Sequence, residues 1–252
     1  MPISLRGEGG DVSVFAGLPP GYAAGFTLRA GGLDQLPPGP LGRRLAAALG
    51  AAGAVVCRAK QVHGAGVLAV DGTLPAPSGV LFAGEGDALV TRERGRLLVV
   101  STADCVPILL LDEASGVVAA VHAGWRGTAE RVVDAALDAM LGPDAPAGSV
   151  VALFGPSISR AAYEVGPEVV AALERAHGGR LPEAAVAPGR GDRLHVDVAL
   201  VNEEALLRRG VARERIFRPA TCTLSEADRF PSYRRDGERA GRIVSGIVRT
   251  AG

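Results

Sequence analysis

Two continuous apolar runs, VPILLLD at residues 106–112 and GVVAAVHAG at residues 116–124, constrain the fold of this chain more than any other feature. Runs that lack alternating polar residues are typical of strands buried on both faces. Only a short turn around EASG separates the two runs, so the sequence predicts an antiparallel hairpin. A hairpin with no exposed face has to lie inside a sheet that other elements cover on both sides.

One end of this hairpin carries a thiol and an imidazole, because Cys105 directly precedes the first run and His122 lies near the end of the second. If the loop is residues 113–114, Cys105 lies opposite His122, and if it is residues 113–116 the two are diagonal neighbours. Both registers place the two side chains on one face, whereas a three-residue loop would separate them. A thiolate and an imidazole so placed form either half of a metal site or a nucleophile–base pair. The alternative is a small buried thiol beside a hydrogen-bonded core histidine.

The rest of the chain mixes strand and helix patterns, without an internal repeat or a linker long enough to divide it. Further strands are expected at residues 54–60, in DALVT and RLLVVST, in SVVALFG, and in the final apolar stretch. Helical spacing of apolar residues occurs in LGRRLAAALGAAG, TAERVVDAALDAML, PEVVAALERAHGG and DVALVNEEALLRRGV. Residues 16–43 and 72–86 are rich in Gly and Pro and are expected to be largely loop, apart from a short strand near residues 26–29. We therefore predict one domain, residues 1–252, of the mixed α/β (α+β) class, with mixed β-sheets flanked by helices.

Composition narrows the classes of function. The formal net charge is zero, which gives no electrostatic reason to expect a nucleic-acid or membrane partner. No apolar run reaches the roughly 18 residues that a membrane helix needs, and MPISLRGEGG at the N-terminus has no secretory pattern. The cysteines Cys57, Cys105 and Cys222 are odd in number and widely spaced, which predicts no disulfide framework and a reducing, cytoplasmic location.

A catalytic zinc site usually has three protein ligands and one open position, so Cys105 and His122 need a third ligand. His63 is the best candidate, because it ends a predicted strand in a loop bounded by glycine. His177 lies at a helix end, where a capping role suffices. His195 lies in RLHVDV and is expected simply to alternate on a strand.

Six motifs occur in a fixed order along the chain: KQVHG, DALVT, TADCVPILL, VHAGWRGT, GPSIS followed by YEVG, and SYRRDG followed by GR. This order resembles that of the YfiH family, which has been labelled both polyphenol oxidase (laccase) and purine nucleoside phosphorylase. They cover roughly residues 54–248, which is most of the chain. FTLRAGG resembles the Arg-x-Gly-Gly stretch of the family, but LDQLPPGPLG replaces the Asn-rich and Asp-containing segment that usually follows.

The resemblance implies a zinc ion held by His63, Cys105 and His122. It also implies phosphorolysis of adenosine, inosine and methylthioadenosine, with adenosine deamination as a further activity. The implied fold is a mixed α/β one related to the deamidase domain of cytotoxic necrotizing factor, where Cys and His are catalytic. The partners it implies are purine nucleosides and phosphate.

Candidate substrate-binding residues surround these ligands in the sequence. Arg126 stands near the N-terminus of a predicted helix, where the amides and the helix dipole already favour an anion such as phosphate. A second anion-binding candidate is the PSYRRDG loop, and two residues beside His63 are expected to touch substrate or orient that ligand. The full set of substrate-binding candidates is Arg29, Lys60, Gln61, Arg126, Ser232, Arg234 and Arg235.

Three classes of function follow. The first is a zinc enzyme acting on purine nucleosides. The second is a metal-free hydrolase or deamidase with Cys105 as thiolate and His122 as base. The third is a copper-dependent polyphenol oxidase; the trio can take copper, but copper is disfavoured, because four histidines cannot furnish both a blue-copper centre and an oxygen-reducing cluster. A structural zinc protein is the remaining alternative, and it is disfavoured because only three ligands of the right type converge.

Overall fold

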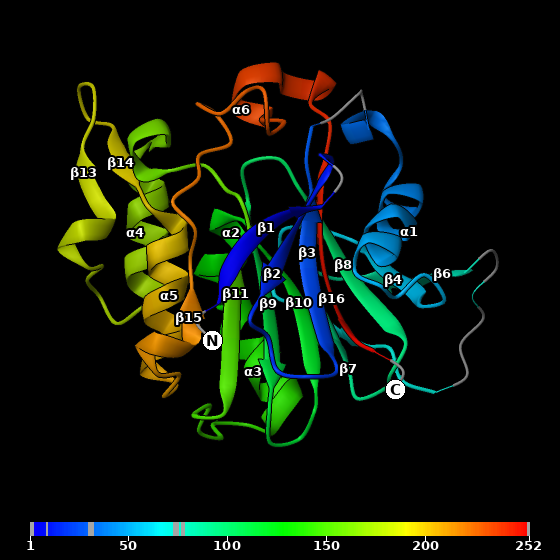
Figure 1. Cartoon of the computed structure of the whole chain (residues 1–252). Helices are drawn as coiled ribbons and strands as arrows, with labels where there is room; N and C mark the ends of the chain where they lie inside the picture. The colour runs from blue at the N-terminus through cyan, green and yellow to red at the C-terminus, as the bar shows by residue number, and fades with distance from the viewer. Residues whose placement is uncertain (1–2, 9, 30–32, 73–75, 77–78, 251–252) are drawn as a thin grey trace.

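The computed structural model describes residues 3–8, 10–29, 33–72, 76 and 79–250, and its long strands form two large sheets (Figure 1). The strands are β1 (Ser4–Glu8), β2 (Val12–Ala16), β3 (Tyr22–Thr27), β4 (Val55–Lys60), β5 (Val67–Ala69), β6 (Val80–Glu85), β7 (Ala88–Thr91), β8 (Arg96–Thr102), β9 (Val106–Asp112), β10 (Val118–Ala123), β11 (Val150–Phe154), β12 (Glu164–Val165), β13 (Val186–Pro188), β14 (Leu194–Val196), β15 (Ile216–Phe217) and β16 (Ile243–Arg249). The α-helices are α1 (Pro38–Ala48), α2 (Trp125–Ala129), α3 (Val132–Leu141), α4 (Pro167–Ala176), α5 (Val198–Arg208) and α6 (Tyr233–Asp236).

Within the described ranges, the first sheet has seven strands in the order β1-β2-β3-β16-β8-β4-β6. The second has six strands in the order β15-β11-β9-β10-β7-β5, and a small third sheet has the order β12-β14-β13. Parallel and antiparallel pairs occur in both large sheets, since β4 runs parallel to β8 while β8 runs antiparallel to β16, and β5 runs parallel to β7 while β7 runs antiparallel to β10. The prediction of mixed sheets is therefore confirmed.

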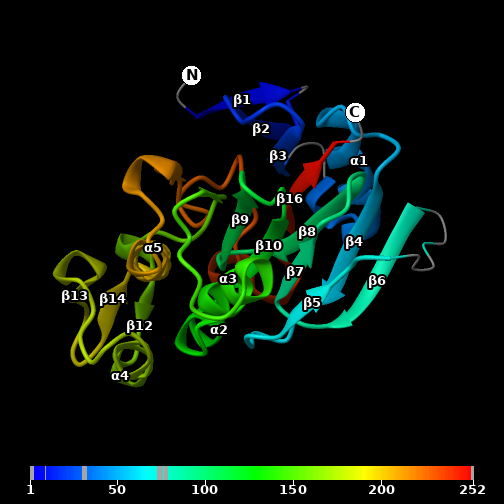
Figure 2. The same cartoon turned by 90° about the horizontal axis from the view of Figure 1, so that it is seen from below.

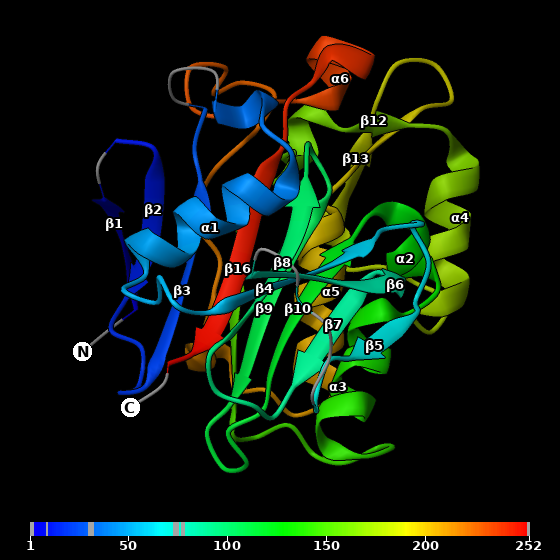
Figure 3. The ribbon, with the colours of Figure 1, turned by 90° about the vertical axis from the view of Figure 1, so that its right-hand side faces the viewer.

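The two large sheets pack face to face through one apolar cluster. It joins Phe26 and Leu98 of the first sheet to Leu109 and Val118 of the second. Helix α1 covers the outer face of the first sheet, where Leu41 packs among residues of β4, β8 and β16 (Figure 3). Helices α3 and α5 cover the outer face of the second sheet (Figure 2). Burying both faces of the central strands explains their unbroken apolar sequences.

The central hairpin has the four-residue loop. Leu111 pairs with Val118 and Pro107 pairs with His122, and the Asp112 amide donates to the Val117 carbonyl at 2.9 Å. Cys105 lies two residues before Pro107, so it is the diagonal neighbour of His122. This is the second of the two registers that place both side chains on one face.

Four expectations from the sequence need correction. The helix predicted in TAERVVDAALDAML is two helices, because Arg131 adopts the left-handed conformation (φ 62°) between α2 and α3. Residues 16–43 are not largely loop: β3 lies between two partner strands in the sheet, and α1 already begins at Pro38. Proline at the first helical position costs no hydrogen bond.

Residues 72–86 likewise contain β6, which pairs with β4 at the edge of the first sheet. The short strand expected near residues 26–29 begins earlier and ends at Thr27. Residues 30–32, 73–75 and 77–78 of the two Gly/Pro-rich segments lie outside the described residues. None of the helices described is both long enough and apolar enough to cross a membrane.

Candidate metal centre

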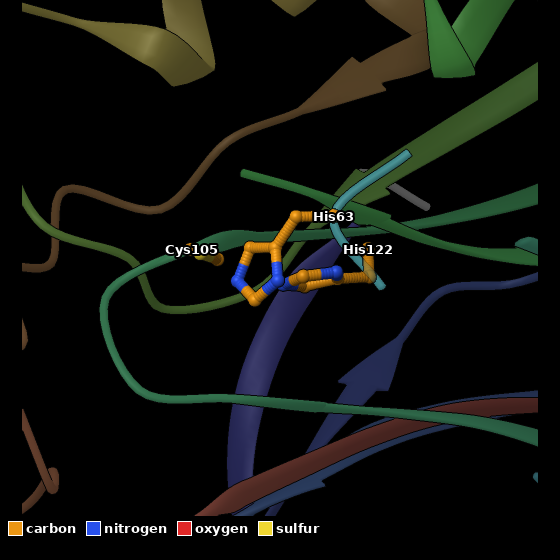
Figure 4. A group of neighbouring side chains, drawn as sticks. All are labelled: His63, Cys105 and His122. Carbon is orange, nitrogen blue, oxygen red and sulfur yellow. The ribbon is translucent and has the colours of Figure 1, made fainter. Parts of the chain in front are cut away.

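Three segments bring His63, Cys105 and His122 to one point (Figure 4). His63 lies in the loop after β4, Cys105 directly precedes β9, and His122 is in β10. One ligand atom from each side chain lies within 4.8 Å of the other two, and the imidazole rings meet edge to face with centroids 4.9 Å apart. The hairpin register accounts for Cys105 and His122, while the loop after β4 supplies His63.

Asp87 holds this arrangement together, and sequence reasoning did not assign it a role. Its carboxylate is almost completely buried and accepts hydrogen bonds from the amides of Val62 (3.2 Å), His63 (2.9 Å) and Gly64 (2.8 Å). It also accepts a hydrogen bond from Nδ1 of His122 at 2.8 Å. With Nδ1 so occupied, Nε2 of His122 is the nitrogen available to a metal. The sequence signal that could have pointed to Asp87 is its position at the start of DALVT, as an acidic residue directly before a buried strand.

Two glycines let α2 approach the cluster closely. A Cβ atom at Gly124 would lie 3.0 Å from Sγ of Cys105 and 3.2 Å from Cδ2 of His63. A Cβ atom at Gly127 would lie 2.8 Å from the carbonyl oxygen of Gly64. Larger residues at either position would displace a ligand or its loop, which explains the glycines that flank WR in VHAGWRGT.

Two residues at the site have left-handed backbones, His63 (φ 63°) and Asp104 (φ 87°). This conformation is uncommon for residues other than glycine and persists where the surroundings fix it. The three amide hydrogen bonds to Asp87 fix the loop of His63. The carboxylate of Asp104 accepts from Oγ1 of Thr223 (2.6 Å) and from the amide of Arg234 (2.7 Å).

The protonation of the cluster differs from that of free side chains. Burial opposes ionisation of the Cys105 thiol, but hydrogen bonds and charges from His122 and His63 lower its pKa to about 7. Burial opposes charging of His122, but Asp87 and Cys105 raise its pKa to about 9. Between about pH 7 and pH 9, metal-free Cys105 is therefore a thiolate and His122 an imidazolium.

The donor set fits a zinc ion. One thiolate and two imidazoles are borderline-soft ligands, and three protein ligands with an open fourth position are typical of catalytic zinc. The same set also accepts copper. The structure thus brings together the three residues proposed as ligands, and the identity of the metal stays a prediction.

The cluster lies in a cleft of about 710 Å³ with a basic lining. Arg126 stacks over the ring of Trp125 at 4.5 Å, and Arg234 lies over the ring of Tyr163 at 5.0 Å and donates to the Glu164 carbonyl. Asp104 is the one carboxylate among the described residues that line the cleft. The lining residues are Pro38, Arg58, Ala59, Lys60, Gln61, His63, Ser101, Thr102, Ala103, Asp104, Cys105, His122, Trp125, Arg126, Tyr163, Tyr233, Arg234 and Arg242.

Lys60 and Gln61 line the cleft, but their side chains already have partners within the protein. Lys60 forms an ion pair with Glu85 at 2.6 Å on the surface. The amide group of Gln61 donates to the carbonyl of Ser101 and accepts from its amide, both at 2.8 Å. Gln61 therefore ties the end of β4 to β8 beside the loop that carries His63.

Three predicted substrate-binding residues lie outside the cleft. Arg29 lies 3.7 Å from Asp34 and 3.5 Å from Asp236, in a separate hollow. Ser232 is fully buried and caps α6 by accepting from the Arg235 amide. The Arg235 guanidinium donates to the carbonyls of residues 223, 224 and 230 and to Asp236, so its donors are used within the protein. The structure therefore places these three residues away from the cleft, each with partners inside the protein, and their proposed role in substrate binding stays a prediction.

The other two histidines have local roles. His177 caps the C-terminal end of α4; its Nε2 bonds to the Thr128 carbonyl and its Nδ1 to Arg208. His195 lies on β14 near the carbonyl of Arg160. Both observations agree with the roles expected from the sequence.

The fold and the site together define a mixed α/β protein with a His–Cys–His cluster at a basic cleft. Residues 42–250 match a family model described as multi-copper polyphenol oxidoreductase laccase. The chain belongs to this laccase-domain family, whose YfiH-like members include purine nucleoside phosphorylases.

Named relatives cover the chain to different extents. A purine nucleoside phosphorylase of Deinococcus radiodurans is 40% identical over 244 residues, which are 90% of this chain and 90% of that protein. A purine nucleoside phosphorylase of Bacteroides thetaiotaomicron is 42% identical over 163 residues, 64% of this chain and 60% of the relative. A protein named adenosine deaminase RL5, from an unknown prokaryotic organism, is 40% identical over 65% of this chain and 62% of its own length. The chain thus matches less than two thirds of the last two proteins.

Solved structures share the fold. The YfiH protein of Bacillus licheniformis has a TM-score of 0.85 at 23% identity and covers 97% of this chain and 98% of its own. YlmD of Geobacillus stearothermophilus has a TM-score of 0.81 at 27% identity and covers 99% of this chain and 100% of its own. The mixed α/β class predicted from the sequence is confirmed as that of the YfiH structures.

Proposed function

We propose that this chain is a zinc-dependent purine nucleoside phosphorylase that acts on adenosine, inosine and methylthioadenosine, with adenosine deamination as a second activity. The observation that carries the proposal is the convergence of His63, Cys105 and His122 in a basic cleft. The names of the relatives support an enzyme that acts on purine nucleosides. The free cysteines agree with our proposal of a cytoplasmic location.

In this proposal His63, Cys105 and His122 hold the zinc ion. When bound, zinc supplies a Lewis acid that polarises the reacting group or activates a water molecule. Asp87 orients His122 and the loop of His63, so that both ligands are in place before the metal arrives. Arg126 and Arg234 line the cleft and hold the phosphate that attacks the nucleoside.

Helix α2 contributes little to phosphate binding, because it has only five residues. The two arginines carry this role instead. Their guanidinium groups stack on Trp125 and Tyr163, which holds them over the cleft at low cost in side-chain freedom.

The test is product identification with metal-defined protein. Adenosine is incubated with and without phosphate, using zinc-loaded and metal-free samples. The proposal expects adenine and ribose 1-phosphate only when zinc and phosphate are both present, and inosine where deamination occurs. Turnover that does not change when zinc is removed contradicts the proposal.

A metal-free cysteine hydrolase or deamidase is the second candidate. The low pKa of Cys105 beside a charged His122 favours it, because a thiolate–imidazolium pair is the resting state of many nucleophilic cysteines. The proposed relation to the deamidase fold of cytotoxic necrotizing factor would support this second candidate, because Cys and His are catalytic in that fold. The zinc content of the purified protein separates the two, since a nucleophilic Cys105 has to be free of metal.

Copper-dependent polyphenol oxidation is the function suggested by the family description. We hold it least favoured for this chain. Two of its four histidines lie at the cluster, while His177 and His195 have partners elsewhere. Reduction of oxygen by a multicopper centre needs many more imidazole ligands.

A further inference from the structure

One wall of the cleft lies at the ends of three neighbouring strands. Arg58 lies near the end of β4, Thr102 ends β8 and Arg242 precedes β16, and all three line the cleft. Strand β8 lies between the other two in the sheet, and Thr102 pairs with Ile243, the neighbour of Arg242. The first helix joins this wall, since Pro38 at the start of α1 also lines the cleft.

Among the described residues, neither arginine of this wall forms an ion pair with a carboxylate. Arg58 lies over the ring of Phe82 at 5.4 Å, and its buried Nε has no hydrogen-bond partner in that part of the chain. The guanidinium group of Arg242 donates to the carbonyls of its neighbours Ala240 and Gly241. Asp104, the carboxylate that lines the cleft, is already bonded to other groups. A pair of cations with free donors favours an anionic ligand.

Two further observations support this ligand chemistry. Arg58 and Arg242 each lie beside a residue of the cluster between the sheets, Cys57 and Ile243, so alternation along the strands directs both arginines to the face of the first sheet that α1 covers. A buried polar atom nearly always has a hydrogen-bond partner, so the orphaned Nε of Arg58 indicates a missing polar ligand or water.

We propose that Arg58 and Arg242 in this wall bind a phosphate group. The inference rests on the proposed function, because it places a nucleoside between these two arginines and the proposed phosphate ligands Arg126 and Arg234. The phosphate is either free phosphate or the 5′-phosphate of a purine nucleotide. The cleft volume of about 710 Å³ lies within the range of sites that enclose a small organic ligand.

The experiment measures binding rather than turnover. Adenosine, AMP and inorganic phosphate are titrated separately, by calorimetry in phosphate-free buffer, into the protein with its metal content recorded. The variants are Arg58→Gln and Arg242→Gln, with Arg58→Lys and Arg242→Lys to preserve the charge. Arg43→Gln is the matched control, because it removes the same charge from an exposed position on α1 that does not line the cleft.

We expect wild type to bind AMP more tightly than adenosine if the phosphate is that of a nucleotide. If the phosphate is free, inorganic phosphate binds and AMP shows no advantage. In either case each Gln variant weakens the phosphate-bearing ligand about tenfold, the loss of one charge-assisted hydrogen bond. The affinity for adenosine and the circular dichroism spectrum stay unchanged. The Lys variants bind the phosphate-bearing ligand more weakly than wild type but less weakly than the Gln variants, and Arg43→Gln binds it like wild type.

Undiminished binding of both AMP and phosphate in the Gln variants overturns the inference, as does absence of any phosphate binding in folded wild type. Should a Gln variant fail to fold, the Lys variants decide, because a phosphate contact made by the planar guanidinium is weakened by Lys while a purely structural charge is not. Failure of the proposed function is a separate outcome. In that case nucleosides are not turned over, whereas AMP or phosphate still binds through Arg58 and Arg242.

Discussion

At the scale of single residues, Asp87 determines the metal centre more than any residue that does not touch the metal. One buried carboxylate accepts four hydrogen bonds, three from the His63 loop and one from His122. It therefore couples two ligands that lie 59 residues apart in the sequence, at 63 and 122. Asparagine has a similar shape, but its amide group can accept fewer of these bonds and brings its own donors.

We predict that Asp87→Asn weakens zinc binding by about 10–100-fold, the usual effect of losing a carboxylate that orients a histidine ligand. Competition with a chromophoric chelator measures this affinity. The metal-free protein also loses about 1–3 kcal/mol of unfolding free energy in urea, because buried amides lose an acceptor. Glu85→Gln is the control, since Glu85 is an exposed carboxylate that pairs with Lys60. Equal zinc affinity in Asp87→Asn and the control contradicts the proposed role.

The pKa values of Cys105 and His122 predict how zinc affinity depends on pH. Zinc requires the thiolate and a neutral imidazole. In the metal-free pair the pKa of Cys105 is about 7 and that of His122 about 9, so at pH 8 the thiol is already ionised and one proton leaves His122 on binding. Apparent affinity therefore rises with pH by about tenfold per unit between these values, more steeply below them, and levels off above pH 9. Calorimetry in buffers of different ionisation enthalpy counts the protons released. Release of none from this pair at pH 8 contradicts the assignment.

At the scale of elements, the sequence predicted what local pattern controls and missed what tertiary contacts control. Strands β9 and β10 follow from unbroken apolar runs, and the Cys105–His122 juxtaposition follows from the hairpin that these two strands form. The break between α2 and α3 could not be predicted, because it occurs at a left-handed Arg131, with no Gly or Pro in the sequence to signal a helix end there; the Arg131 side chain pairs with Asp134. Helix propensities alone do not predict a left-handed arginine inside a helical pattern.

In the candidate site, too, the sequence predicted the features set by local pattern and missed those set by tertiary contacts. The three proposed ligands were singled out by residue type, hairpin register and motif resemblance, and the structure brings them together. The role of Asp87 depends on a loop folding back over 23 to 25 residues of sequence, which no spacing rule anticipates. Arg235 was proposed as an anion-binding residue because of its charge, but its guanidinium group donates to carbonyl groups of the protein.

Helix α2 and the cluster are in such close contact that one methyl group should disturb both. We predict that Gly124→Ala lowers zinc affinity about tenfold or more, because its Cβ atom would lie 3.0 Å from Sγ of Cys105 and force a ligand to move. The backbone of Gly124 is extended (φ −72°), so alanine adds no backbone strain there. Gly148→Ala is the matched control, since the nearest atom to its Cβ would be 4.0 Å away. Chelator competition on both variants measures the effect, and equal zinc affinities would show that the contact does not constrain the ligands.

At the scale of the whole molecule, the proposed metal ligands connect the two large sheets. His63 follows β4 of the seven-stranded sheet, His122 is in β10 of the six-stranded sheet, and Cys105 lies in the link from β8 to β9 that crosses between them. The apolar cluster between the sheets already joins them in one core, which supports our proposal of a single domain for residues 1–252. A metal at this junction would stabilise the same contact.

We therefore predict that the protein binds about one zinc ion per chain, contains no stoichiometric multicopper centre, and melts at a lower temperature when zinc is removed. A ligand that binds the native state alone adds about 2.7 kcal/mol at a free concentration of 100 times its Kd. For a domain of this size, that shift corresponds to about 5–10 °C in Tm. Elemental analysis of protein prepared without added copper gives the stoichiometry, and differential scanning calorimetry with and without chelator gives the shift. Cys105→Ala should lose the bound zinc and the chelator effect together, whereas Cys57→Ala, which changes a buried thiol outside the cluster, should keep both. A chelator effect that persists in Cys105→Ala, or several copper ions per chain, would mean that the metal is held elsewhere or is not zinc.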